Sequence, residues 1–109
     1  MSVLKRFEDM TGTEKDNECS IVYYPIAEFI YPRLKYFREC VKMTYPAEFN
    51  SMEEWNNILD KMLFAFDFTL NEMNGFSSID FDTERYQTAL DKANEGFKLF
   101  GEYFLNLWD

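Results

Sequence analysis

Apolar residues recur at helical spacing along most of the chain, and this pattern predicts three helices. The middle helix has a stripe whose positions step by four or three residues: Trp55, Leu59, Met62, Phe66, Leu70 and Met73. Ser51 followed by Glu54 forms a capping box ahead of the stripe, and Gly75 stands just past its end. We therefore expect a helix over residues 52 to 74.

The C-terminal part of the chain carries a heptad seam that predicts a second long helix. Its members alternate steps of four and three residues: Tyr86, Leu90, Ala93, Phe97, Phe100, Phe104 and Leu107. Ser78 or Asp82 can cap its start. Gly96 and Gly101 interrupt it, and such glycines usually let another backbone approach closely. The seam predicts a helix that continues nearly to the last residue.

The first helix of the pattern lies in an aromatic stretch that contains Pro25 and Pro32. Two interpretations are open, because each proline is tolerated in the first turn of a helix. Either one helix runs from about Pro25 with a kink at Pro32, or a short turn leads into a helix that starts at Pro32. We prefer the kinked helix, and we expect it to end before Tyr45 and Pro46.

This first helix is apolar on two sides after Pro32. One side carries Leu34, Phe37 and Val41, and the opposite side carries Tyr36, Cys40 and Met43. Cys40 on such a stripe is expected to be buried and inert. Lys35, Arg38 and Lys42 form a basic strip between the two sides, and it can bind acidic residues of the same fold or of a second copy.

The elements together predict an all-α fold, an antiparallel three-helix bundle in a single helical domain over residues 21 to 109. Residues 1 to 20 show no sustained period, so we expect a mobile or loosely packed N-terminal arm. No segment has the alternation of a strand.

Composition narrows the functions open to this fold. The 109 residues include 11 Lys and Arg against 20 Asp and Glu, a net charge of −9, which disfavours direct binding of nucleic acid. No histidine is present, so the chain has no imidazole for a metal centre or a catalytic triad. Asp80, Asp82 and Glu84 alternate like the start of a calcium loop, but Asp91 stands where its closing Glu is expected. We expect no enzyme, catalytic residue, cofactor or metal.

The cysteines and the absence of long apolar runs favour a cytoplasmic protein that does not enter a membrane. Cys19 and Cys40 are 21 positions apart and form no CxxC pair, and a disulfide between them is left open. No stretch of 18 uncharged apolar residues occurs. Thiols in the cytosol are usually reduced.

Three segments of the last 80 or so residues resemble a family of small bacteriophage and prophage proteins. They are YPRLKYF at 31 to 37 with YP at 45 and 46, EEWNNILDKMLFAF at 53 to 66, and EGFKLFGEYFLNLWD at 95 to 109. The last is similar to a GL-x-LF-x-x-Y-x-x-LW ending, with Phe97 where Leu is usual. The resemblance implies a phage origin and the host cytoplasm as location, and it transfers no catalytic residue. Because phages encode many small acidic inhibitors, anti-CRISPR proteins among them, it also favours an inhibitor of host defence.

Two rows of acidic residues are the first candidates for binding a partner. They lie opposite the apolar stripes of their predicted helices: Glu53, Asp60 and Asp67 on one, and Glu84, Asp91, Glu95 and Glu102 on the other. Residues 47 to 95 carry eleven acids and three bases, a net of −8. Such rows can imitate the phosphates of DNA toward a basic groove, and a solvated polar face explains the same pattern.

Phe64 and Phe68 are the second candidates, because both lie away from the predicted core stripe and flank the acidic row. If exposed, they form an apolar patch suited to a partner. The alternative is that the first helix or the arm covers them.

These features predict a non-enzymatic protein-binding module. The leading hypothesis is an anti-CRISPR-like inhibitor of a host protein, one with a basic nucleic-acid-binding groove, acting through the acidic rows as a DNA mimic. The alternative is a phage structural or assembly accessory that self-associates through its aromatic faces, as a homodimer for example.

Overall fold

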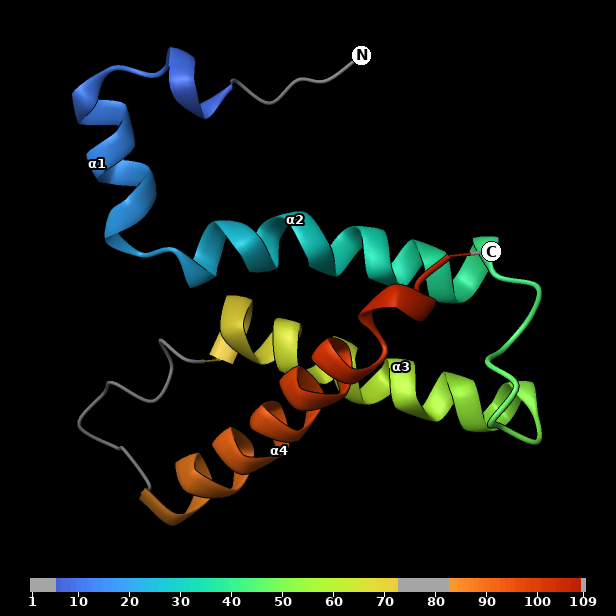
Figure 1. Cartoon of the computed structure of the whole chain (residues 1–109). Coiled ribbons are helices and arrows are strands. Elements are labelled where there is room, and N and C mark those ends of the chain that lie inside the picture. Colours follow the sequence, from blue (N-terminus) through green and yellow to red (C-terminus); the bar gives the residue numbers. More distant parts are fainter. Residues whose placement is uncertain (1–5, 73–82, 109) are drawn as a thin grey trace.

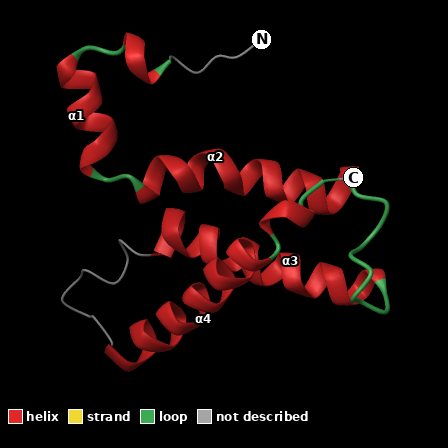
Figure 2. Ribbon diagram, viewed as in Figure 1, coloured by secondary structure: helices red, strands yellow, loops and turns green. Residues whose placement is uncertain are grey.

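The computed structural model describes residues 6–72 and 83–108, and its regular structure in these ranges is entirely helical (Figures 1 and 2). The all-α prediction is therefore confirmed. The α-helices are α1 (Gly12–Ser20), α2 (Tyr23–Tyr36), α3 (Met52–Asp67) and α4 (Thr83–Glu102). Short helical turns add η1 (Phe7–Asp9), η2 (Phe37–Val41), η3 (Phe68–Glu72) and η5 (Phe104–Asn106), of which η2 and η3 are π-helical.

Helix α3 is central, because both α2 and α4 pack on it. It begins where the sequence predicts: the Ser51 hydroxyl accepts a hydrogen bond from the Glu54 N–H at 3.2 Å. The Glu54 carboxylate accepts from the Asn50 N–H at 3.4 Å. The predicted stripe is confirmed over most of its length, since four of its members are buried: Trp55, Leu59, Met62 and Phe66.

Helix α2 runs antiparallel to α3 and lies beside it (Figure 1). It begins at Tyr23 and passes through Pro32, so the interpretation that a helix starts at Pro32 is wrong. Ala27 and Leu34 are its buried residues. Because a π-helical turn follows at Phe37–Val41, the side chains after Tyr36 do not keep the α-helical register. Cys40 is exposed and free for this reason, which corrects the expectation of a buried thiol.

Helix α4 crosses α3 obliquely (Figure 1), and small residues line the crossing. Ala65 of α3 and Ala93 of α4 are fully buried. A Cβ added at Gly96 would lie 2.7 Å from the Ala65 Cβ and would collide with the Lys61 backbone oxygen. The predicted close approach of another backbone is thus confirmed at Gly96, but it is wrong at Gly101, which has nothing within 4 Å of such a Cβ.

The C-terminal tail leaves the heptad seam at the end of α4. The helix ends at Glu102, and a 3-10 turn follows at Phe104–Asn106. Tyr103 is buried in place of Phe104, whose side chain is 55% exposed. The seam therefore fails at Phe104, because the tighter turn rotates the side chains by a different angle per residue, whereas Leu107 is half-buried and packs against the core.

The N-terminal arm contains a helix that apolar periodicity did not predict. Thr11 caps α1: its hydroxyl accepts from the Glu14 N–H at 3.1 Å, and the Glu14 carboxylate accepts from the Thr11 N–H at 2.9 Å. No residue of α1 is buried, and the helix stands away from the other three (Figure 1). The radius of gyration is 16.5 Å, against about 13 Å for a compact chain of this length.

Several predicted positions lie outside the described residues. They are the last stripe residue and the proposed caps and calcium-loop positions: Met73, Gly75, Ser78, Asp80 and Asp82.

We predict that Gly96→Ala destabilises the protein by about 1 to 2 kcal/mol, because overpacking at the α3–α4 contact outweighs the gain in helix propensity. Urea unfolding followed by circular dichroism measures this change in free energy. Gly101→Ala is the matched control, and with open space around it the substitution should stabilise by up to about 1 kcal/mol. Equal effects of the two substitutions would contradict the close packing at Gly96.

Candidate protein-interaction surfaces

The acidic row of α3 is only partly free. Asp60 forms a two-pronged ion pair with Arg38 of η2, in which Nε and one terminal nitrogen donate to the two carboxylate oxygens at 2.7 and 3.2 Å. Asp67 accepts a hydrogen bond from the Asn71 side-chain amide at 2.7 Å. Glu53 is exposed. The basic strip of the first predicted helix thus binds an acid of its own fold through Arg38.

The acidic row of α4 is also partly engaged. Glu95 lies 3.5 Å from the Lys61 ammonium of α3. Asp91 accepts a hydrogen bond from the Gln87 side chain at 2.9 Å. Glu84 and Glu102 are exposed. Both rows are therefore interrupted by a neutralised carboxylate, which weakens their likeness to the unbroken charge of a DNA strand.

The carboxylates of three of the seven predicted acids form no hydrogen bond or ion pair with a described residue: Glu53, Glu84 and Glu102. They come from two helices and lie at the ends of the rows. These three are the part of the predicted acidic surface that stays available to a basic partner.

Phe64 and Phe68 do not form an exposed patch. Phe68 is 1% exposed and packs with Ala65 and Ala93, so it belongs to the core between α3 and α4. Phe64 is half-buried, and the Lys92 ammonium of α4 lies 4.2 Å from the centre of its ring. The element that covers both rings is α4, whereas the sequence had suggested the first helix or the arm. The prediction that Phe68 is an exposed partner-binding residue is therefore wrong.

An apolar groove lies between α2 and α4, which both pack on α3 but diverge from each other (Figure 1). Two hollows of about 330 and 350 Å³ share Ile30 and Phe100 and form its length. Phe66 and Thr69 belong to its floor. Its walls include exposed side chains of α2 and the tail: Tyr23, Ile26, Phe29 and Phe104. Most of its lining is therefore aliphatic or aromatic.

Sequence reasoning missed this groove, although a signal for it exists. Tyr23, Ile26 and Ile30 are spaced three and four residues apart and share one side of a helix. The two apolar sides predicted for this helix begin after Pro32, so they do not include this stripe in the first half of α2.

Arg33 stands at the edge of the groove. Its guanidinium carbon lies 3.9 Å from the centre of the Phe29 ring, a cation–π geometry, and Nη1 donates to the Phe29 carbonyl oxygen at 2.9 Å. These contacts fix a positive charge beside an apolar surface. The groove can therefore select an occupant by charge as well as by shape.

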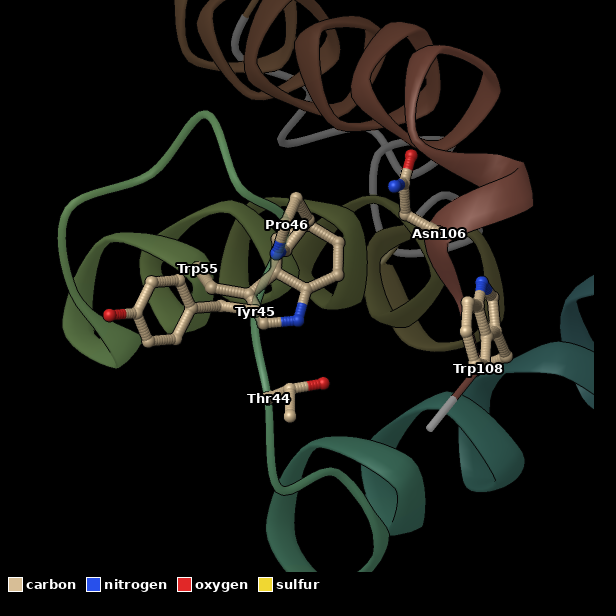
Figure 3. Close-up of a pocket in the computed structure, with 6 residues that line it drawn as sticks. All are labelled: Thr44, Tyr45, Pro46, Trp55, Asn106 and Trp108. Carbon is tan, nitrogen blue, oxygen red and sulfur yellow. The ribbon is translucent and has the colours of Figure 1, made fainter.

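A small pocket lies on another side of the tail and has polar edges (Figure 3). Its volume is about 90 Å³. It is lined by Thr44, Tyr45, Pro46, Trp55, Asn106 and Trp108. Loop 42–51, α3 and the C-terminal tail thus meet at one place.

The wall of this pocket is held by an aromatic cluster. The rings of Phe49, Trp55 and Tyr103 have centroids 5.4 to 5.7 Å apart. The Tyr103 hydroxyl donates to Glu48 Oε2 at 3.1 Å. Burial raises the pKa of Tyr103 above its usual 10.0, and the hydrogen bond to Glu48 and the negative charges of Glu48 and Glu102 raise it further.

Other candidate chemistry is sparse within residues 6–72 and 83–108. No group of three or more Cys, Asp or Glu in these ranges is arranged to hold a metal ion. Cys19 and Cys40 are both free and exposed. Among the same residues, no helix combines the length and the apolar character needed to cross a bilayer.

Comparison with known protein families, with characterised proteins and with solved structures finds nothing that matches this chain. The grounds for assigning a function are therefore the surfaces described above.

We predict that Tyr103→Phe changes how stability depends on alkaline pH. A raised pKa means that the folded state holds the phenol proton more tightly, so this contribution is complete below pH 10.0 and is lost as the pH rises through the folded-state pKa. The free energy of unfolding of the wild type relative to that of Tyr103→Phe should therefore be smaller at about pH 11 than at about pH 8. Urea unfolding at both pH values measures it, and a constant difference would contradict the Glu48 hydrogen bond.

Proposed function

We propose that this chain is a non-enzymatic protein-binding module, an antiparallel three-helix bundle with an N-terminal arm, whose main binding surface is the groove between α2 and α4. The observation that carries the proposal is the continuity of the two hollows through Ile30 and Phe100. Exposed apolar surfaces of this extent mark sites of interaction on soluble domains. A groove between helices is the usual receptor for an amphipathic helix of a partner.

The occupant that we propose is an amphipathic helix with carboxylates beside its apolar face. Arg33 fixes a positive charge at the groove of a chain with net charge −9, whereas Arg38 in the same basic segment is already paired with Asp60. Complementary charge at the rim of an interface raises specificity and the association rate. The phage resemblance makes a host protein the first partner to test.

A non-enzymatic role is supported by the chemistry that the chain offers. It has no histidine, and the groove lining contains one charged side chain, that of Arg33. A cleft of this composition supplies apolar contact and no acid–base pair for a reaction.

A second candidate function keeps the acidic rows as the binding surface, toward a host defence or nucleic-acid-handling protein with a basic groove. The unpaired carboxylates of Glu53, Glu84 and Glu102 support it. Inhibition in the manner of an anti-CRISPR protein or a DNA mimic belongs to this candidate. The engaged Asp60 and Glu95 make it the weaker of the two.

We predict that Ile26→Glu and Phe104→Glu, one in each hollow, weaken binding of a host partner at least tenfold, because each places a carboxylate in an apolar contact. The partner is captured from a bacterial lysate, identified and purified, and its affinity is then measured by interferometry. Leu105→Glu is the matched control, since Leu105 is 83% exposed and lines neither hollow.

The alternatives give different results in the same experiment. If changing Glu53, Glu84 and Glu102 together to Gln abolishes binding while Ile26→Glu leaves it intact, the acidic rows form the binding surface. If light scattering finds a dimer that Ile26→Glu dissociates, a second copy fills the groove, as for a self-associating assembly protein. A partner bound equally by every variant would overturn the groove as its site.

A further inference from the structure

We propose that the small pocket beside Trp55 is a second binding site, which receives a proline-rich peptide segment in the extended polyproline II conformation. The pocket is separate from the groove between α2 and α4. Leu107 lines the groove, whereas its neighbours Asn106 and Trp108 line the pocket. The C-terminal tail thus divides the two surfaces, and either one can be altered without the other.

Trp55 offers the pocket an unused hydrogen-bond donor. Trp55 is 1% exposed, and its indole N–H donates to no described residue. Figure 3 shows the indole nitrogen on the edge of the ring toward Thr44 and Trp108. An indole nitrogen can only donate, so its partner must be an acceptor. A ligand that brings an acceptor to this position adds a hydrogen bond that no described residue makes.

The lining of the pocket favours an uncharged ligand. The described residues that line the pocket include no Lys or Arg, so a carboxylate or a phosphate would find no counter-ion among them. One face of the Trp55 ring is covered, because Phe49 stacks on it with centroids 5.6 Å apart. The ring edge that Trp55 presents is the positive part of its quadrupole. The pocket chemistry therefore favours a neutral acceptor, such as a peptide carbonyl.

A proline-rich segment suits the donors and the size of the pocket. A polyproline II segment makes no internal hydrogen bonds, so its carbonyl groups are free to accept from Trp55 and from the side chains of Thr44 and Asn106. Proline brings no N–H that would need its own acceptor. Pro46 and Trp108 provide flat apolar walls, and a volume of about 90 Å³ is on the scale of one small ring. Aromatic-lined sites with indole donors are the general means of recognising such segments.

Intrinsic fluorescence tests the proposal directly, because the chain has two tryptophans and both line this pocket. The full chain is titrated with an acetylated hexaproline amide, and a glycine–serine peptide of the same length is the control ligand. We expect a saturable change in tryptophan emission with hexaproline and none with the control. Thr44→Val and Asn106→Leu should each weaken binding about tenfold, the effect of one lost hydrogen bond.

Leu105→Ala is the matched control variant, since Leu105 lies in the same tail but does not line the pocket. It should bind hexaproline as the wild type does, and circular dichroism verifies that every variant is folded. The absence of a saturable response to millimolar hexaproline overturns the proposal, as does equal binding by Asn106→Leu and the wild type. Ile26→Glu and Phe104→Glu should leave this titration unchanged, so failure of the groove and failure of the pocket are distinguishable.

Discussion

The close packing of α4 on α3 is the contact on which the rest of the structure depends. With Gly96 against the Lys61 backbone, and Ala65 and Ala93 fully buried, the two helices meet through small residues. Large rings find no room between them and pack on both sides of the contact. Phe68 and Tyr86 lie on one side, while Phe66, Phe97 and Phe100 form edge-to-face pairs on the other. One core is thereby split into two clusters.

This split also explains the open groove. Helix α4 is fixed to α3 at the crossing, and α2 is fixed to α3 by Ala27, Leu34 and the Arg38–Asp60 pair, so α2 and α4 have no extensive contact with each other. The molecule measures 21 Å in its thinnest direction, about two helix diameters. A bundle this thin cannot cover both sides of α2, and Ile26 and Phe29 stay exposed for that reason.

Sequence periodicity predicted α3 and its buried stripe because the residues of that stripe face one core cluster and recur with the period of the α-helix. It missed α1, whose residues have no apolar period, although Thr11 and Glu14 form the same capping signal that located α3. It misplaced Cys40 because a π-helical turn changes the register, and nothing in the pattern marks such a turn. The prediction of an exposed Phe68 was wrong because α3 has two contact faces. The ion partners of Asp60 and Glu95 were not predicted, because they come from other helices that only the tertiary structure brings near.

Charge decides between the two kinds of occupant for the groove. In a symmetric dimer the same patch meets itself, so Arg33 would lie near its own copy. Two chains of net charge −9 also repel each other at distances up to a Debye length of about 8 Å. A partner helix with carboxylates on its flank avoids the first penalty, since it pairs with Arg33 while its apolar face covers Ile26 and Phe104. The same basic edge that opposes self-association therefore favours a different, acidic partner.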